Sequence, residues 1–246
     1  MSVSLRCYST SLGCPKNRVD TERLLGSLGV ALVPVESPDE AELVFINTCA
    51  FIQPATEESV RTIAQAIADI EELPKRPLLA VAGCLVGRYH AEDLAPELPE
   101  VDLWLDNSDL EAWPAMLARK LGLPEPTVPG RILSTGPSYA WLKISDGCRH
   151  ACSFCAIPNI RGGHRSHCKD MIVREARALL DQGVKELNLV AQDLTEWGCD
   201  LDGKQDLRTL LDGLLPLQGL ERLRLMYLYP AGMTHEMLKY LREACL

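Results

Sequence analysis

The sequence lacks any long hydrophobic run. Of its 246 residues, 47% are hydrophobic, but no stretch reaches the roughly 18 apolar residues that a transmembrane helix needs. Residues 1–6 contain no apolar segment long enough for a signal peptide. We therefore expect a cytoplasmic protein without a membrane partner. In a reducing compartment its ten cysteines are more often ligands or catalysts than disulfides.

Positive charge is in the minority, with 25 Lys and Arg against 34 Asp and Glu and a formal net charge of -9. This balance weighs against broad binding to nucleic acid, because phosphate contacts need a basic face. Some basic residues do gather around one cysteine-rich stretch, where they either form a solvated surface or bind an anion: Arg149, Arg161, Arg165, Lys169 and Arg174. The five histidines show no pattern of nucleophile and base, so we assign no catalytic side chain.

The cysteine-rich stretch covers residues 147–155. Cys148, Cys152 and Cys155 have the spacing C-x3-C-x2-C, with Phe154 just before the third cysteine. Three thiolates on one tight loop suit a four-iron cluster (4Fe–4S) that keeps one iron without a protein ligand. The alternatives are three unrelated thiols or a zinc site. Zinc normally takes a fourth protein ligand, which one of three histidines would supply: His150, His164 or His167.

Strands alternate with helices along the whole chain, which predicts a parallel α/β architecture. In the first half we expect strands and helices in the order 5–8, helix from about 15, 30–35, 43–46, helix 54–72, 78–82, 101–105 and helix 109–121. Residues 123–138 are rich in proline and glycine and read as a linker. Beyond it we expect three βα units, with strands at 141–144, 186–190 and 223–228 and helices at 170–182, 207–215 and 234–245.

Three further cysteines share one setting in the first half. Cys14, Cys49 and Cys84 each follow the carboxyl end of an expected strand, at two intervals of 35 residues. The carboxyl ends of parallel strands face one crevice, where ligands bind, so we predict that these cysteines meet at one ligand site. The alternative is three small buried thiols in tight turns. The remaining cysteines match no motif and are expected to be structural or incidental: Cys7, Cys168, Cys199 and Cys245.

The loop at residues 148–155 resembles that of the radical S-adenosylmethionine (AdoMet) enzymes. Its continuation Cys155-Ala156-Ile157-Pro158, followed by Arg161-Gly162, resembles the methylthiotransferase branch. Residues 11–17, 47–52 and 83–85 resemble the amino-terminal domain of that branch. Within it, Pro15-Lys16-Asn17 is closer to enzymes that act on an aspartate of a small-subunit ribosomal protein than to those acting on transfer RNA.

The resemblance implies a domain organisation. Residues 1–122 would be the methylthiotransferase amino-terminal domain, an open parallel α/β sheet, and residues 123–138 a linker. Residues 139–246 would form the first half of a radical-AdoMet partial TIM-like (βα) barrel. The family's barrel continues further and is followed by a small β-barrel (TRAM) domain, so we expect a truncated chain that is inactive or nearly so alone.

The resemblance also implies two 4Fe–4S clusters and AdoMet as cofactors. Cys148, Cys152 and Cys155 would hold the cluster that binds and reduces AdoMet, and Cys14, Cys49 and Cys84 an auxiliary cluster. Phe154 and Ala156 would line the adenine side, with core packing as the alternative. Gln192 and Asp193 would touch AdoMet or substrate, with helix capping as the alternative. Arg161 and Arg165 would bind a carboxylate, whereas His167 stands where the family often has arginine.

The implied reaction uses AdoMet twice. One molecule would methylate a sulfur carried by the auxiliary cluster, and a second would give the radical that removes hydrogen from the β-carbon of the aspartate. The carbon radical would then take up the methylthio group. Partners would be the ribosomal protein, an electron donor and a sulfur donor. The alternatives are the same chemistry on a transfer-RNA adenosine, or a non-catalytic zinc scaffold.

Overall fold

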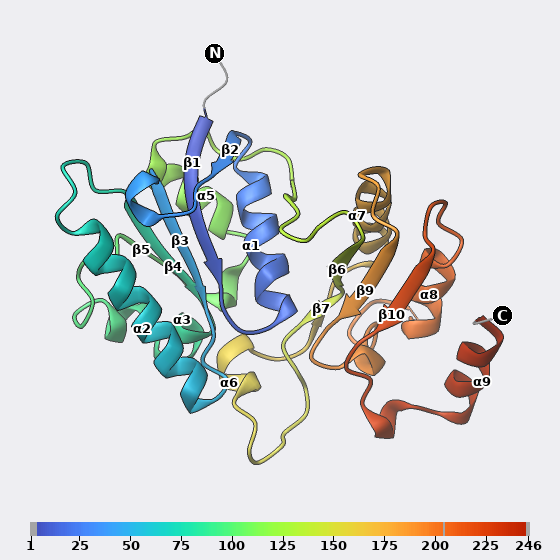
Figure 1. Ribbon diagram of the computed structural model, residues 1–246. Helices are drawn as coiled ribbons and strands as arrows, with labels where there is room; N and C mark the ends of the chain where they lie inside the picture. The colour runs from blue at the N-terminus through green and yellow to red at the C-terminus, as the bar shows by residue number, and fades with distance from the viewer. Residues whose placement is uncertain (1–3, 204, 245–246) are drawn as a thin grey trace. The chain divides into compact units, whose positions relative to one another are not determined.

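A computed structural model describes residues 4–203 and 205–244 (Figure 1). The chain forms two compact units. Unit 1 comprises Met1–Ser134 with Asn159–Arg161, and unit 2 comprises Thr135–Pro158 with Gly162–Leu246. Among the described helices, none has the length and hydropathy needed to cross a membrane.

Unit 1 is built on a five-stranded parallel sheet with the order β2-β1-β3-β4-β5. The strands are β1 (Ser4–Ser11), β2 (Ala31–Pro34), β3 (Leu43–Thr48), β4 (Leu78–Gly83) and β5 (Leu103–Leu105). Every residue of β3 is buried, as expected for a strand covered on both faces. The register pairs Ser11 with Asn47 and Thr48 with Gly83. The carboxyl ends of β1, β3 and β4 therefore lie at one edge of the sheet, which confirms the predicted open parallel α/β fold.

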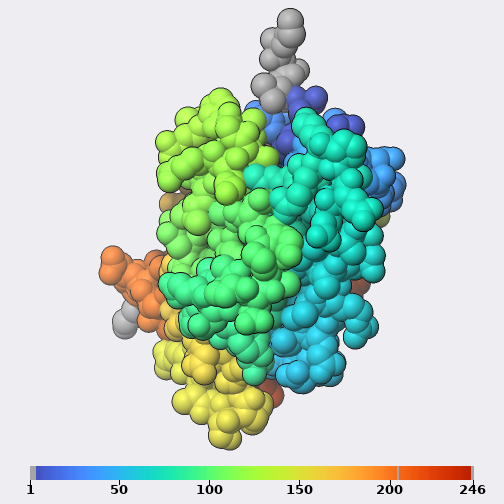
Figure 2. Space-filling model, turned by 90° about the vertical axis from the view of Figure 1, so that its left-hand side faces the viewer, coloured from blue at the N-terminus to red at the C-terminus, as the bar shows by residue number. Residues whose placement is uncertain are grey.

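Helices cover both faces of this sheet (Figure 1). On one face, α1 (Pro15–Ser27) and α5 (Trp113–Leu121) contribute Leu24, Leu25, Trp113 and Leu117 to the hydrophobic core. On the other lies α2 (Gln53–Ile70), whose buried side chains recur at helical spacing: Thr56, Ser59, Ile63, Ala66 and Ile70. The outer surface of α2, cyan in Figure 2, is exposed at its charged positions.

The structure differs from the expected elements after β4. Two short helices, α3 (Cys84–Tyr89) and α4 (Ala91–Leu94), were not predicted because each has only one or two turns. The helix expected from residue 109 begins at Trp113. A separate 3-10 turn, η2 (Asn107–Asp109), precedes it, and the Asp106 carboxylate caps that turn by accepting the Ser108 N–H at 2.6 Å. Another 3-10 turn, η1 (Pro38–Glu40), precedes β3.

The middle of the proline- and glycine-rich stretch packs against α1. Glu22, whose side chain is 2% exposed, accepts hydrogen bonds from Arg131 at 2.7 and 2.9 Å and from the Ser134 N–H and hydroxyl at 2.9 and 2.6 Å. A Cβ at Gly26 would stand 2.4 Å from the Arg131 nitrogen. Residues 130–134 are therefore part of unit 1.

Unit 2 contains a three-stranded parallel sheet with the order β10-β9-β6. Its strands are β6 (Tyr139–Lys143), β9 (Glu186–Val190) and β10 (Arg222–Leu225), and they alternate with α7 (Lys169–Asp181), α8 (Leu207–Leu214) and α9 (His235–Ala244). This is the expected series of three βα units. The third strand ends three residues early, where Tyr227 adopts a φ of 69° and turns the chain. Thr234 caps α9 by accepting the Met237 N–H at 3.2 Å, whereas Cys245 lies outside the described residues.

Several shorter elements lie between the main strands and helices. An antiparallel pair joins β7 (Ser145–Asp146) to β8 (Arg165–Ser166), and α6 (Ile157–Arg161) lies between them in sequence. Two 3-10 turns, η3 (Leu194–Glu196) and η4 (Pro230–Gly232), follow β9 and β10. None of these was predicted, because two-residue strands and single turns carry no periodic signal.

Candidate metal centres

The structure brings Cys14, Cys49 and Cys84 together; we call them the amino-terminal trio. Cys14 directly precedes α1, Cys49 follows β3, and Cys84 begins α3 after β4. Burial raises the pKa of the Cys49 thiol, and the neighbouring Cys84 and Cys14 raise it further. The strand order reverses between β1 and β3, which is where open α/β sheets bind ligands.

Asn17 connects the three loops that carry this trio. Its side chain is fully buried and donates to the carbonyls of Leu12 at 3.0 Å and Thr48 at 2.8 Å. Its Oδ1 lies 3.8 Å from the Cys84 Sγ. The Asn17 amide thus contacts three places: the segment before Cys14, the segment before Cys49, and the Cys84 side chain.

Other buried polar side chains hold the backbone of the trio. Ser59 of α2 donates to the Cys49 carbonyl at 2.7 Å and accepts the Cys49 N–H at 3.0 Å. Asn107 places its Nδ2 3.8 Å from the Cys84 Sγ. Gly13, with a φ of 82°, permits close approach, since a Cβ there would stand 2.7 Å from the Cys49 Sγ.

Arg161 belongs to this centre, and the expectation that it binds a carboxylate of AdoMet or substrate does not hold. Its side chain is 2% exposed and pairs with Asp20 at 3.2 Å, while it also donates to Asn17 Oδ1. Its charge lowers the pKa of the Cys49 thiol, against the larger effect of burial. The guanidinium therefore places positive charge near the Cys49 thiol.

Cys148, Cys152 and Cys155, the loop trio, lie in a loop after β7. Burial raises the pKa of the Cys148 thiol, the His150 N–H lowers it, and Cys155, Asp193 and Cys152 raise it again. The loop closes through a hydrogen bond of 3.0 Å from the Cys155 N–H to the Cys152 carbonyl. Cys152 and Cys155 are therefore near enough to Cys148 to raise the pKa of its thiol, and Cys152 is exposed to solvent.

The start of the loop trio is fixed by a close backbone approach. The Cys148 N–H donates to the Gly162 carbonyl at 3.3 Å. A Cβ at Gly147, where φ is 65°, would stand only 2.0 Å from the Gly163 carbonyl oxygen. Glycine is therefore required directly before the first cysteine of the loop.

Two residues expected near AdoMet follow in the same loop. Phe154 is 87% exposed, so the alternative of core packing is wrong for this ring. Ala156 is half-buried and directly precedes α6. Gln192 is half-buried just beyond the carboxyl end of β9.

Asp193 ties the loop trio to the ends of two strands. It caps η3 by accepting the Thr195 N–H at 2.8 Å, so the predicted capping is confirmed. It also bonds to His150 Nε2 at 2.8 Å and accepts the Tyr229 N–H at 3.4 Å. The His150 ring packs on that of Tyr229, with centroids 4.6 Å apart. Burial raises the pKa of Asp193, but the hydrogen bonds from His150 and Thr195 outweigh it and lower the pKa overall.

The other basic residues near the loop each have different partners. Arg149 pairs with Glu196 at 3.0 Å. His167 bonds to the Lys143 carbonyl and to Asp146, both at 3.1 Å. Arg165 is exposed and pairs through its backbone with Asp146 in β7. The buried Arg161 is thus paired with Asp20, apart from the exposed Arg165.

Comparisons with known proteins find matches along most of the chain. The model of the "Uncharacterized protein family UPF0004" matches residues 6–106, and that of the "Radical SAM superfamily" matches residues 142–246. The ribosomal protein uS12 methylthiotransferase RimO of Nitratidesulfovibrio vulgaris (strain DP4) is 68% identical over 96% of this chain and 55% of its own length. The chain belongs to the radical AdoMet methylthiotransferase family.

Further methylthiotransferases with the same name support this assignment. That of Lawsonia intracellularis is 59% identical over 98% of this chain and 55% of its own length, and that of Aquifex aeolicus is 47% identical over 95% and 52%. The chain therefore spans about half the length of the curated relatives it matches. Membership of the radical AdoMet superfamily implies AdoMet and a 4Fe–4S cluster as cofactors.

Solved structures agree on the fold. The radical AdoMet methyltransferase TsrM from Kitasatospora setae, with cobalamin and a 4Fe–4S cluster bound, matches with a TM-score of 0.63 at 14% identity. The match covers 99% of this chain and 59% of TsrM. It confirms the fold, an α/β sheet domain followed by a partial (βα) barrel.

Proposed function

We propose that this chain carries both cluster-binding centres of an enzyme that methylthiolates the β-carbon of an aspartate in ribosomal protein uS12. The observation that carries the proposal is the meeting of Cys14, Cys49 and Cys84 at one sheet edge, in a chain that also has the radical AdoMet loop. A single cluster would need only the loop trio. The second set of three thiols would hold the further cluster that an enzyme needs when it also transfers sulfur.

The amino-terminal trio has the chemistry of an iron–sulfur site. Three thiolates ligate three irons of a 4Fe–4S cluster and leave the fourth open. Within the described residues, Asn47 Oδ1 and Asn107 Oδ1 are buried without a hydrogen-bond partner, and Asn107 already contacts Cys84. Such groups are suited to polar contacts with a bound centre. Arg161 offsets the charge that three thiolates would bring into a buried site.

The zinc alternative at the loop trio finds little support. Two of the three histidines that it would draw on are held elsewhere: His150 by Asp193 and His167 by Asp146. A zinc ion with bonds of about 2.3 Å also holds its ligands roughly 3.8 Å apart. In the described parts of the chain, groups of three metal-ligating atoms within 4.8 Å of one another exist, but neither cysteine trio is among them.

The chain's own residues would position the reactants. When bound, the clusters and AdoMet supply the 5′-deoxyadenosyl radical and the sulfur to be transferred. The link from His150 to Asp193 fixes the loop trio relative to the ends of β9 and β10. Phe154 is free to cover the adenine because it is exposed, Ala156 would contact it through the backbone, and Gln192 would contact AdoMet or substrate from the end of β9.

The proposal is tested by reconstituting the protein anaerobically with iron and sulfide. It should hold about eight irons, as two clusters require. Cys49→Ser and Cys155→Ser should each lose about half, whereas Cys168→Ser, an exposed cysteine outside both trios, should lose none. With AdoMet, an electron donor and a sulfur donor, mass spectrometry should find one methylthio group on uS12.

Three outcomes would contradict the proposal. About four irons in the wild-type protein, unchanged in Cys49→Ser, would remove the auxiliary cluster. A methylthio group on transfer RNA and none on uS12 would reverse the choice of substrate. Zinc without sulfide at the loop trio would end the enzymatic proposal.

A further inference from the structure

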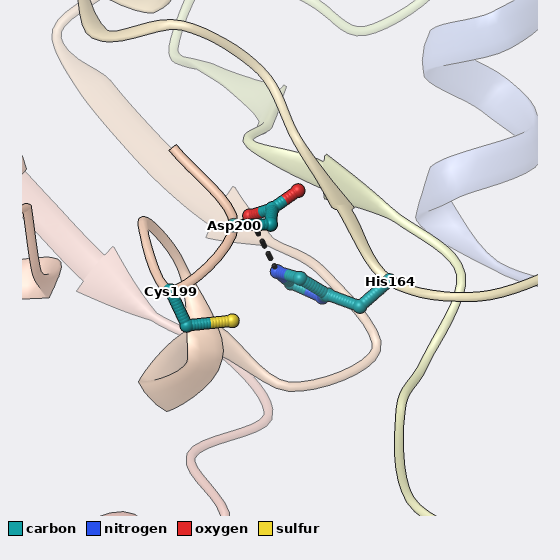
Figure 3. Close-up of side chains that lie close together, drawn as sticks. All are labelled: His164, Cys199 and Asp200. Atoms are coloured by element: carbon teal, nitrogen blue, oxygen red, sulfur yellow. Dashed lines mark ion pairs between the residues drawn. The ribbon is translucent and has the colours of Figure 1, made fainter. Parts of the chain in front are cut away.

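Three side chains that differ in donor atom lie together in unit 2, outside both cysteine trios (Figure 3). His164 precedes β8, while Cys199 and Asp200 follow η3. One ligand atom from each lies within 4.8 Å of the other two. The His164 Nε2 and the Asp200 Oδ1 are 3.6 Å apart, and Figure 3 shows the imidazole directed towards the carboxylate.

The two sequence-distant halves of this cluster are held in place by hydrogen bonds. The Ser166 N–H donates to Asp200 Oδ2 at 2.8 Å, which leaves Oδ1 towards His164. The Gly198 N–H donates to the Ser166 hydroxyl at 2.9 Å. Trp197, 1% exposed, donates its Nε1–H to the His167 carbonyl at 3.1 Å. Supporting bonds of this kind keep metal ligands in one orientation.

Burial and charge favour a dication at this position. The His164 side chain is 4% exposed, whereas Cys199 and Asp200 are open to solvent. Burial raises the pKa of Asp200, but the hydrogen bonds from Ser166 outweigh it, so the carboxylate is ionised at neutral pH. Burial raises the pKa of the Cys199 thiol, against the hydrogen bond that Arg149 donates to it, and Glu196 balances the charge of Arg149 at 3.0 Å.

We propose that His164, Cys199 and Asp200 form a binding site for a zinc-class divalent ion, with water in the fourth position. A thiolate with an imidazole selects zinc over magnesium or calcium, which prefer oxygen ligands alone. Tetrahedral zinc holds such ligands about 3.3–3.8 Å apart. The three ligands can therefore reach zinc geometry by side-chain rotation alone. In that rotation the Nε2 of His164 leaves the Ser166 hydroxyl, now 3.0 Å away, and binds the metal.

The test uses the protein with its cluster sites filled, so that zinc cannot occupy them. After anaerobic reconstitution and removal of loose metal, the protein is dialysed against micromolar zinc, and zinc and iron are counted in the same sample. We expect one zinc per chain. Cys199→Ser should weaken binding by more than about tenfold, since even supporting residues of metal sites contribute tenfold or more.

The matched control is Cys168→Ser, an exposed cysteine of the same unit, which should bind zinc like the wild type. His164→Gln provides a second variant that removes a different ligand. Zinc X-ray absorption should show one sulfur near 2.3 Å with nitrogen and oxygen near 2.0–2.1 Å. Equal binding by Cys199→Ser, no zinc at all, or a shell of sulfur alone would overturn the site.

Discussion

The buried pair of Arg161 and Asp20 gives the sharpest test of how unit 1 is held together. Arg161→Gln removes a guanidinium that is 2% exposed and lies 3.2 Å from an Asp20 carboxylate that is 3% exposed. Removing one partner of such a pair costs about 3–5 kcal/mol, because the other charge keeps its desolvation penalty. Glutamine can still donate one hydrogen bond, so we expect the lower end, about 3 kcal/mol.

Native-state hydrogen exchange measured by mass spectrometry shows where the protein loses stability in Arg161→Gln. Peptides covering β3 and β4, whose residues are almost all buried, report the opening of the unit 1 core. A loss of about 3 kcal/mol should accelerate their exchange roughly a hundredfold. The control is Arg61→Gln, which removes an exposed arginine from α2 and should change stability by less than about 0.5 kcal/mol.

A double variant separates the pair from its surroundings. Asp20→Asn with Arg161→Gln removes both charges, so its loss should fall short of the sum of the single losses by about 1–3 kcal/mol. Acceleration below tenfold in Arg161→Gln, or equal acceleration in Arg61→Gln, would refute the assignment of a structural role to this pair.

Three further predictions follow from the same unit. Burial raises the pKa of Cys7 to about 12. The neutral Cys7 thiol therefore contributes fully to the free energy of unfolding below about pH 9, and this contribution is lost as pH rises towards 12. Cys7→Val should therefore flatten the alkaline fall in urea stability, by up to about 1.4 kcal/mol per pH unit. Gly13→Ala should halve the iron content, because its Cβ would meet Cys49. In the holoprotein, Arg161→Gln should lower the reduction potential of the auxiliary cluster, since a positive charge favours the reduced state.

Each of these predictions has a contrary result, and two of them have a control. Gly29 has a similar φ of 68° but nothing within 4 Å of an added Cβ, so Gly29→Ala should keep its iron; equal losses would point to backbone strain alone. An unchanged alkaline slope in Cys7→Val would mean that other groups set it. In the electrochemical titration the potential of the loop-trio cluster should stay constant, and a parallel shift of both would contradict a local charge effect.

The strands and the gathering of cysteines were predictable because they follow from local rules. The apolar run in β3 and the helical spacing in α2 fix the element types. Parallel strands place their carboxyl ends at one edge, which was enough to bring Cys49 and Cys84 together. Short elements such as α3 carry too few residues for a periodic pattern, and they were missed.

The partners of Arg161 could not be predicted. Arg161 and Asp20 are 141 positions apart, and an arginine six residues after Cys155 gives no local sign that it folds into unit 1. The exposure of Phe154 was equally hidden, because an aromatic residue beside a cysteine loop fits core packing and ligand contact alike. In both cases tertiary packing decides, and sequence spacing holds no information about it.

The amino-terminal trio depends on sheet register in a way that the loop trio does not. Cys49 and Cys84 each follow one of the paired residues Thr48 and Gly83. A shift of one residue between β3 and β4 would separate them along the sheet and turn one strand's side chains to the opposite face. Because the residues of both strands are almost all buried, such a shift would disrupt the close packing of their side chains against the covering helices. The hydrophobic core of unit 1 thus fixes the position of the proposed ligands, and loss of core packing should release iron before it unfolds unit 2.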